Sequence, residues 1–258
     1  MDDRSRSKLI NQTCAPLFIG DALLADGHTA TTSSATATFV RFQGKTYAVT
    51  CRHVRKDASA VTGWSARLHA GVAVIPLANW SSAGLTSILR DAADESGVDI
   101  SLCRNPDHLF DVVSQAKPKT PIDLDTYEEP NWGEISFCLA AGFPDRIKTE
   151  QGGSVFSTMA EVVAEVTSNL LPSSETFVLH SNLGEPSPVG LSGMSGGPIF
   201  ALREEGSPLP LGILFQGRPS GEVTDVPPGA FLTDADISIR GCLLSPTVFA
   251  RWLQGAGL

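Results

Sequence analysis

The chain has little of what membrane proteins and nucleic-acid-binding proteins need. No stretch of its 258 residues approaches the roughly 20 apolar residues of a membrane span. The first 34 residues contain no sustained apolar run of signal-peptide length. The net charge is −9, and no cluster of Lys or Arg offsets it, which opposes non-specific binding to nucleic acid. We therefore expect neither a membrane partner nor a nucleic-acid partner.

Cysteines are few and scattered. The five cysteines are odd in number and lie far apart: Cys14, Cys51, Cys103, Cys138 and Cys242. Disulfide frameworks of small secreted domains use even numbers of cysteines at characteristic spacings. The pattern predicts free thiols, no structural disulfide and a reducing, cytoplasmic location.

The positions of the histidines limit the catalytic arrangements to which the segment Gly193–Pro198 can belong. This segment reads Gly-Met-Ser-Gly-Gly-Pro. A serine flanked by glycines can attack a carbonyl while backbone N–H groups approach its oxygen. The segment also fits a plain glycine-rich turn, or the G-x-S-x-G elbow of α/β-hydrolases, whose histidine follows the serine. All five histidines precede Ser195: His28, His53, His69, His108 and His180. Among the known Ser-His-Asp triads, only those in which the histidine precedes the serine in sequence fit this chain.

Two upstream segments offer a base and an acid. Tyr47–Val54 reads as a strand running into a turn, with His53 at the exit of the strand. Further on, Val98 and Ile100 mark one apolar face, which turns Asp99 to the opposite side of a buried strand. Each residue alone also fits a structural role, as a partly exposed histidine or a salt-bridged aspartate. A buried carboxylate needs a partner, however, and an imidazole that becomes charged during a reaction would be one.

Together these segments resemble the trypsin/chymotrypsin-like serine protease family. That family has a histidine after a strand, an aspartate in an Asp-aliphatic-small-Leu strand and a Gly-x-Ser-Gly-Gly-Pro loop, in this order. The matching motifs here are Thr50-Cys51-Arg52-His53, Asp99-Ile100-Ser101-Leu102 and Gly193–Pro198. The resemblance implies a catalytic triad of His53, Asp99 and Ser195, with an oxyanion hole formed by the N–H groups of Gly193 and Ser195. It implies no metal and no organic cofactor.

The expected fold is all-β. Frequent glycine and proline, 24 and 17 residues, favour many short strands. The resemblance implies two antiparallel Greek-key β-barrels with a C-terminal helix, which helical spacing places at Pro246–Leu253. A hairpin turn is expected at Gln43-Gly44 and a strand at Ala66–Leu77. The expected divisions are an N-terminal extension (1–34), a barrel carrying His and Asp (35–115), a linker (116–131) and a barrel carrying Ser with the terminal helix (132–258).

The residues that would bind substrate follow from the same resemblance. Leu211–Gly217 is similar to the strand on which these enzymes lay the substrate backbone, where a peptide adds to a sheet edge. Trypsin-like enzymes carry an aspartate for basic side chains in a pocket wall that here is apolar, so we expect an apolar residue at the cleavage position. The expected substrate-binding residues are Val189, Gly190, Leu191, Phe215, Gln216, Gly217 and Phe231.

Two departures from the family pattern indicate which branch of the trypsin/chymotrypsin-like family the chain resembles. Met194 stands where secreted members place the aspartate that pairs with a newly cut N-terminus, so activation by N-terminal insertion is not expected. Leu214 or Phe215 stands where many members place a serine that hydrogen-bonds the buried aspartate. These features are more similar to bacterial non-zymogen members that lack disulfides, such as the HtrA type.

The sequence therefore predicts a serine endopeptidase acting on a protein or peptide substrate, with a partner protein as one way to activate it. Two other functions stay open. A binding or scaffold protein can keep the fold without turnover, and an esterase or transferase can use the same triad, because acyl chemistry alone does not name the leaving group.

Overall fold

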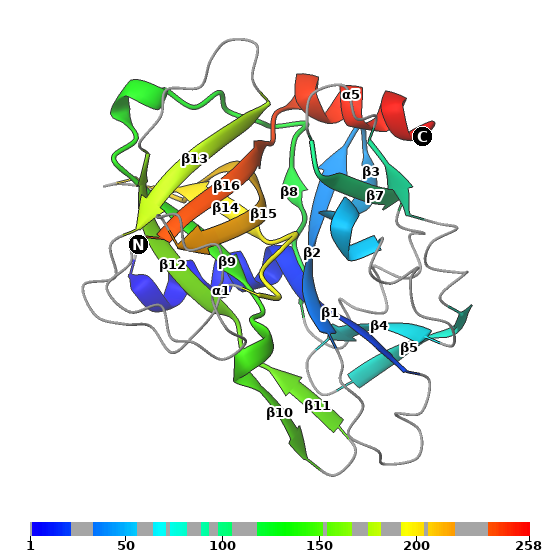
Figure 1. Cartoon of the computed structure of the whole chain (residues 1–258). Coiled ribbons are helices and arrows are strands. Elements are labelled where there is room, and N and C mark those ends of the chain that lie inside the picture. The colour runs from blue at the N-terminus through cyan, green and yellow to red at the C-terminus, as the bar shows by residue number, and fades with distance from the viewer. Residues whose placement is uncertain are drawn as a thin grey trace.

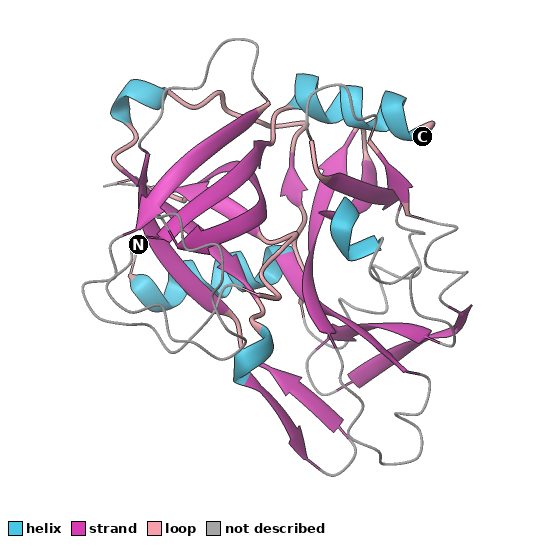
Figure 2. Cartoon of the chain, viewed as in Figure 1, coloured by secondary structure: helices cyan, strands magenta, loops and turns pink. Residues whose placement is uncertain are grey.

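The computed structural model describes residues 2–21, 33–55, 64–70, 73–81, 89–92, 98–104, 118–151, 154–166, 175–181, 192–203, 206–219 and 237–258. Strands dominate, and the longest helices lie near the two ends of the chain (Figure 2). Within these ranges, no helix combines the length and the hydrophobicity needed to cross a membrane.

The N-terminal half forms an eight-stranded sheet (Figure 1). Its path runs β5-β4-β1-β2-β3-β7-β6, and β8 pairs in parallel with β2. The strands are β1 (Cys14–Asp21), β2 (Ser33–Phe42), β3 (Lys45–Cys51), β4 (Trp64–Ala70), β5 (Ala73–Ser81), β6 (Arg90–Asp91), β7 (Ile100–Arg104) and β8 (Ile122–Asp123).

A two-residue turn sets the register of β2 and β3. Gln43 and Gly44 both have positive φ, 51° and 68°, as a type I′ hairpin turn requires. The Asp125 carboxylate accepts hydrogen bonds from both backbone N–H groups, at 2.6 and 2.8 Å. The predicted hairpin is therefore present. Asp125, in the segment that joins the two halves of the molecule, stabilises its turn.

The C-terminal half is a closed six-stranded barrel in the order β12-β13-β16-β15-β14-β9. Its strands are β9 (Phe137–Gly142), β12 (Ala160–Val166), β13 (Thr176–Ser181), β14 (Pro198–Ala201), β15 (Leu209–Pro219) and β16 (Ile237–Leu243). A separate hairpin, β10 (Lys148–Gln151) and β11 (Ser154–Ser157), extends away from it (Figure 1). Two short 3₁₀ helices, Trp132–Glu134 and Asp145–Ile147, flank β9.

One hydrophobic core joins the two halves. It combines Val49 and Leu102 of the N-terminal sheet with Leu139 and Phe200 of the barrel. The C-terminal helix α5 (Pro246–Ala256) closes this core, although it follows the barrel in sequence. Its Phe249 ring lies edge-on to the rings of Phe42 and Tyr47, with centroids 5.5 and 5.4 Å apart.

The all-β class, the closed barrel and the C-terminal helix confirm the expected architecture. Two elements differ from the expectation. The segment assigned to an N-terminal extension contains the helix α1 (Asp3–Thr13) and β1, which pairs with β2. The single strand expected at Ala66–Leu77 is two strands, because β4 ends at Ala70 and pairs antiparallel with β5. All five cysteines are buried with free thiols.

Candidate active site

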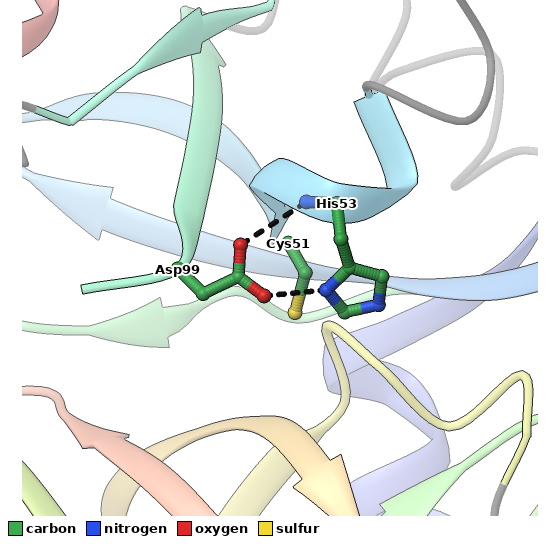
Figure 3. Close-up of side chains that lie close together, drawn as sticks. All are labelled: Cys51, His53 and Asp99. Atoms are coloured by element: carbon green, nitrogen blue, oxygen red, sulfur yellow. Dashed lines mark hydrogen bonds and ion pairs between the residues drawn. The ribbon is translucent and has the colours of Figure 1, made fainter. Parts of the chain in front are cut away.

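The side chains of His53 and Asp99 meet where β3 ends and β7 begins (Figure 3). The register of the two strands places Cys51 opposite Ile100. One residue beyond, the Arg52 N–H donates to the Asp99 carbonyl oxygen at 3.1 Å. His53 Nδ1 then bonds to Asp99 Oδ2, and the His53 backbone N–H donates to Oδ1 at 3.1 Å. Strand pairing thus sets the position of the carboxylate, which in turn sets the orientation of the imidazole.

This hydrogen bond selects one tautomer of a neutral imidazole. A proton on Nδ1 faces the carboxylate, so Nε2 carries the lone pair. The His53 side chain is 42% exposed, while that of Asp99 is 21% exposed. The pair can therefore accept a proton at Nε2, and the Asp99 charge can stabilise the imidazolium that results.

Two further side chains approach the Asp99 carboxylate. Arg52 Nε lies 3.9 Å from Oδ1. The Cys51 Sγ lies within 4.8 Å of ligand atoms of both His53 and Asp99, and its thiol donates to the Leu214 carbonyl oxygen at 3.3 Å. Burial, and then the charge of Asp99, raise the pKa of the Cys51 thiol well above its usual range. In the folded protein this thiol is neutral and is no nucleophile.

The loop that carries Ser195 is a turn that only glycines can build. Gly193 and Gly196 have φ values of 93° and 91°, a region that L side chains rarely adopt. A Cβ on Gly193 would lie 2.6 Å from the Phe143 carbonyl oxygen, and one on Gly196 would lie 2.0 Å from that of Thr36. The predicted glycine-rich turn is therefore present, and it packs backbone against backbone.

The Ser195 loop and the end of β3 both donate hydrogen bonds to the same atom of β15. The Leu214 carbonyl oxygen accepts the Gly196 N–H at 2.7 Å as well as the Cys51 thiol. An added Cβ on Gly196 would also lie 3.0 Å from Thr50 Cα. The loop therefore lies against the strand that leads into His53. The Ser195 hydroxyl itself forms no hydrogen bond with any residue that the structure describes.

Two backbone donors of this loop have no acceptor among the residues that the structure describes. The Ser192 carbonyl oxygen accepts the Asp145 N–H at 2.9 Å. Because the C=O and N–H of a trans peptide point in opposite directions, this bond turns the Gly193 N–H away from Asp145. Neither the Gly193 N–H nor the Ser195 N–H donates to an acceptor within the described part of the chain. The loop can therefore offer both groups to a developing oxyanion.

Buried threonines of β2 hold the loop in this conformation. The Thr36 hydroxyl donates to the Gly193 carbonyl oxygen and accepts the Phe143 N–H, both at 3.0 Å, and the Thr36 N–H donates to the Ser195 carbonyl oxygen at 2.9 Å. The Thr38 hydroxyl donates to the Gly196 carbonyl oxygen at 2.7 Å. Sequence reasoning missed both threonines. Their spacing of two in a strand, which places them on one face, was the available signal.

Comparison with known proteins shows what this architecture is. No protein-family model and no curated protein sequence matches the chain. Among solved structures, the thermostable serine protease AL20 from an extremophilic microorganism matches with a TM-score of 0.50 at 14% identity, covering 95% of this chain and 97% of that one. The protease Anisep from Arthrobacter nicotinovorans matches with a TM-score of 0.50 at 10% identity, covering 96% of each chain. The fold is that of the chymotrypsin-like serine proteases.

Within this chymotrypsin-like fold, β15 has an edge that no described strand occupies. β14 pairs with β15 only as far as Ile213, whereas β16 continues to Pro219 on the other side. Phe215 and Gln216 are half-buried here, and Gly217 lies in the same strand. The other expected substrate-binding residues, Val189, Gly190, Leu191 and Phe231, lie outside the described residues.

Met194 occupies the core of the barrel in this chymotrypsin-like fold. Its side chain is fully buried with Leu211 and Ile199. Burial of the methionine therefore adds a hydrophobic anchor to the hydrogen bonds that hold the Ser195 loop.

Proposed function

We propose that the protein is a serine endopeptidase with Ser195 as nucleophile, His53 as general base and Asp99 as the group that orients His53. The observation that carries this proposal is the juxtaposition of two preorganised parts. One part is the His53 imidazole, which follows β3 and is held by a carboxylate. The other is a glycine turn against the same strand, which presents a hydroxyl and two N–H groups that have no acceptor among the described residues. The chymotrypsin-like fold supports this assignment.

The proposed reaction follows from the tautomer of His53. Nε2 takes the proton of the Ser195 hydroxyl as Oγ attacks the peptide carbonyl, and then returns it to the leaving amine. Water repeats the sequence to release the acyl group. Asp99 stays ionised throughout and stabilises the imidazolium. The N–H groups of Gly193 and Ser195 bind the oxyanion, and the loss of one such donor typically lowers the rate by about 10²–10³.

The substrate is proposed to be an extended peptide that pairs with the edge of β15 that no described strand occupies. Main-chain hydrogen bonds to residues 215–217 would align it, as in other cases of strand addition. The apolar sequence Val189-Gly190-Leu191 favours an apolar side chain at the cleavage position. Since Met194 cannot form an ion pair, the enzyme is proposed to need no cleavage of its own chain, as in non-zymogen bacterial branches. We propose a cytoplasmic location because of its five free thiols.

Labelling with a fluorophosphonate probe tests the nucleophile. The wild-type protein is expected to react covalently at Ser195, because only a serine activated by a base attacks the phosphorus. Ser195→Ala is expected to abolish labelling. Ser207→Ala changes an exposed serine in the loop before β15 and is expected to leave labelling intact. Equal labelling of wild type and Ser195→Ala would refute the assignment.

Cleavage of a peptide library separates an endopeptidase from an esterase. New N-termini are expected with the wild type and not with Ser195→Ala, and they should follow apolar residues. Hydrolysis of activated esters without any peptide cleavage would favour the esterase, and absence of both activities would favour a scaffold protein.

A further inference from the structure

Three chemically different metal ligands converge beside β3. A thiol, an imidazole and a carboxylate, from Cys51, His53 and Asp99, have ligand atoms that all lie within 4.8 Å of one another. Figure 3 shows the Cys51 sulfur directed toward the hydrogen bond between the other two side chains. The thiol is fully buried, whereas the imidazole opens to solvent. An ion could therefore approach from the solvent-exposed side of the imidazole and reach the buried sulfur.

The spacing is close to that of a zinc site. With Zn–S and Zn–N distances of about 2.3 and 2.1 Å, two ligands on a tetrahedral ion lie about 3.6 Å apart. The widest pair of ligand atoms would have to approach by about 1 Å, whereas His53 Nδ1 and Asp99 Oδ2, now joined by a hydrogen bond, would have to separate. A sulfur, a nitrogen and an oxygen donor together suit Zn²⁺ and other thiophilic divalent cations better than Mg²⁺ or Ca²⁺.

Local charge favours a dication at this position. Among the described residues, Arg52 is the cation near Asp99: its Nε lies 3.9 Å from Oδ1, while Oδ2 bonds to the imidazole. A bound dication would compensate the charges of the Asp99 carboxylate and of a Cys51 thiolate at once.

We propose that Cys51, His53 and Asp99 form a binding site for a thiophilic divalent cation such as Zn²⁺, and that the bound ion inhibits the enzyme. The ion takes Cys51 Sγ, His53 Nδ1 and Asp99 Oδ2 as ligands, and solvent supplies a fourth. One proton, from the Cys51 thiol, leaves to bulk water. The proton of neutral His53 moves from Nδ1 to Nε2 through solvent, so no oxidant or reductant is involved.

Inhibition follows from this change of tautomer, and this part rests on the proposed function. With the metal on Nδ1, the lone pair of Nε2 is replaced by an N–H. His53 then cannot accept the Ser195 proton, even if the substrate still binds. The metal is expected to lower kcat much more than it changes KM.

Cobalt binding tests the site without any need for activity. Titration of Ser195→Ala with Co²⁺ under reducing conditions is expected to produce the near-ultraviolet charge-transfer band of a Co²⁺–thiolate bond at one equivalent. Calorimetry in two buffers of different ionisation enthalpy is expected to show release of about one proton per ion, because one thiol is deprotonated. Adding Cys51→Ala to Ser195→Ala should remove the band. Adding Cys103→Ala, which removes a buried thiol of β7 outside the group, should retain it.

The results separate the two levels of the proposal. If no thiolate band forms, or if the band survives Cys51→Ala, the metal site is wrong whatever the enzyme does. If the band forms and Zn²⁺ leaves kcat of the active wild type unchanged, the inhibition is wrong. If the band forms and the wild type hydrolyses nothing after treatment with a chelator, the site stands and the proposed function fails. Inhibition of the wild type by at least 10-fold, reversed by chelator and absent in Cys51→Ala, is the expected outcome.

Discussion

At the scale of single residues, the Thr36 hydroxyl is the side-chain group that bonds most directly to the Ser195 loop. Thr36→Val keeps the shape of the side chain but leaves the Gly193 carbonyl and the Phe143 N–H without their buried partner. We expect a loss of about 1–3 kcal/mol in the free energy of unfolding. We also expect kcat to fall by about 10- to 100-fold with a smaller change in KM, because the loop shifts relative to the reacting carbonyl.

Two variants make the Thr36 experiment specific. Thr36→Ser restores the hydroxyl and should recover most of kcat. Thr13→Val removes another buried hydroxyl, which donates to the Ile10 carbonyl oxygen at the end of α1, and should lower stability without lowering kcat. Urea unfolding and steady-state kinetics measure both effects. Equal kcat values for Thr36→Val and the wild type would rule out a positioning role.

Buried thiols predict an alkaline loss of stability. Burial raises the pKa of Cys103, Cys138 and Cys242 to about 12, whereas a thiol in the unfolded chain titrates near about 8.5. The unfolded state therefore releases protons first. Stability from these groups is complete below about pH 8.5 and falls as the pH rises toward 12, by up to about 1.4 kcal/mol per pH unit for each thiol.

Urea unfolding between pH 8 and pH 10 in the presence of a reductant measures this slope. Cys138→Ala removes one of the thiols and is expected to make the decline shallower. An identical slope in the variant would mean that other groups, such as lysines or tyrosines, cause the alkaline loss.

The sequence could predict those site residues whose signals are local. Glycines around Ser195 indicate a turn, and apolar neighbours place Asp99 on the opposite face of its segment. The spacing of Thr36 and Thr38 indicated only a shared face of a strand. The partners of Thr36 and Asp145 could not be predicted because they lie far along the chain: Thr36 bonds to a residue 157 positions away. No local pattern reports which carbonyl a buried hydroxyl will meet.

At the scale of elements, α5 connects the two halves of the molecule. It begins at an N-cap, Ser245, whose side chain accepts the Val248 N–H, and it ends before Gly257, whose φ is 68°. Its apolar face packs onto rings from the N-terminal sheet. Phe249→Ala removes the ring at the centre of this contact and is expected to cost about 3–5 kcal/mol.

Thr247→Ala is the matched control for this helix. Thr247 lies two residues before Phe249, on the exposed face of the helix, so its substitution should change stability by no more than about 0.5 kcal/mol. Comparison of urea midpoints tests the difference. A cost below about 1 kcal/mol for Phe249→Ala would mean that α5 contributes little to the shared core.

Helices of this chain differ in how far their sequence predicts them. α5 combines Pro246, regular apolar spacing and a terminal glycine, and the sequence predicted it. α1 carries few apolar residues, and its C-terminal end depends on Lys119, whose ammonium group donates to the Asn11 and Cys14 carbonyl oxygens. That lysine lies more than 100 positions away, so tertiary contact stabilises a helix with a weak local signal.

At the scale of the whole molecule, the candidate site requires both halves to be folded together. The His53 and Asp99 pair belongs to the N-terminal sheet, while the Ser195 loop belongs to the barrel. The core between them mixes side chains of both halves and of α5, so neither half can open without exposing apolar surface of the other. We therefore expect one cooperative unfolding transition rather than two.

Labelling of individual thiols tests this cooperativity. Cys103 lies in the N-terminal sheet and Cys138 in the barrel, and both are buried and free. Each reacts with a thiol reagent only when its own half opens, and mass spectrometry reports the two separately. The two labelling midpoints in urea should coincide with each other and with the midpoint of the change in tryptophan fluorescence. Phe249→Ala should lower both labelling midpoints equally. If Cys138 became reactive at urea concentrations that leave Cys103 protected, the barrel would unfold alone, and the shared core could not be what holds the Ser195 loop against β3.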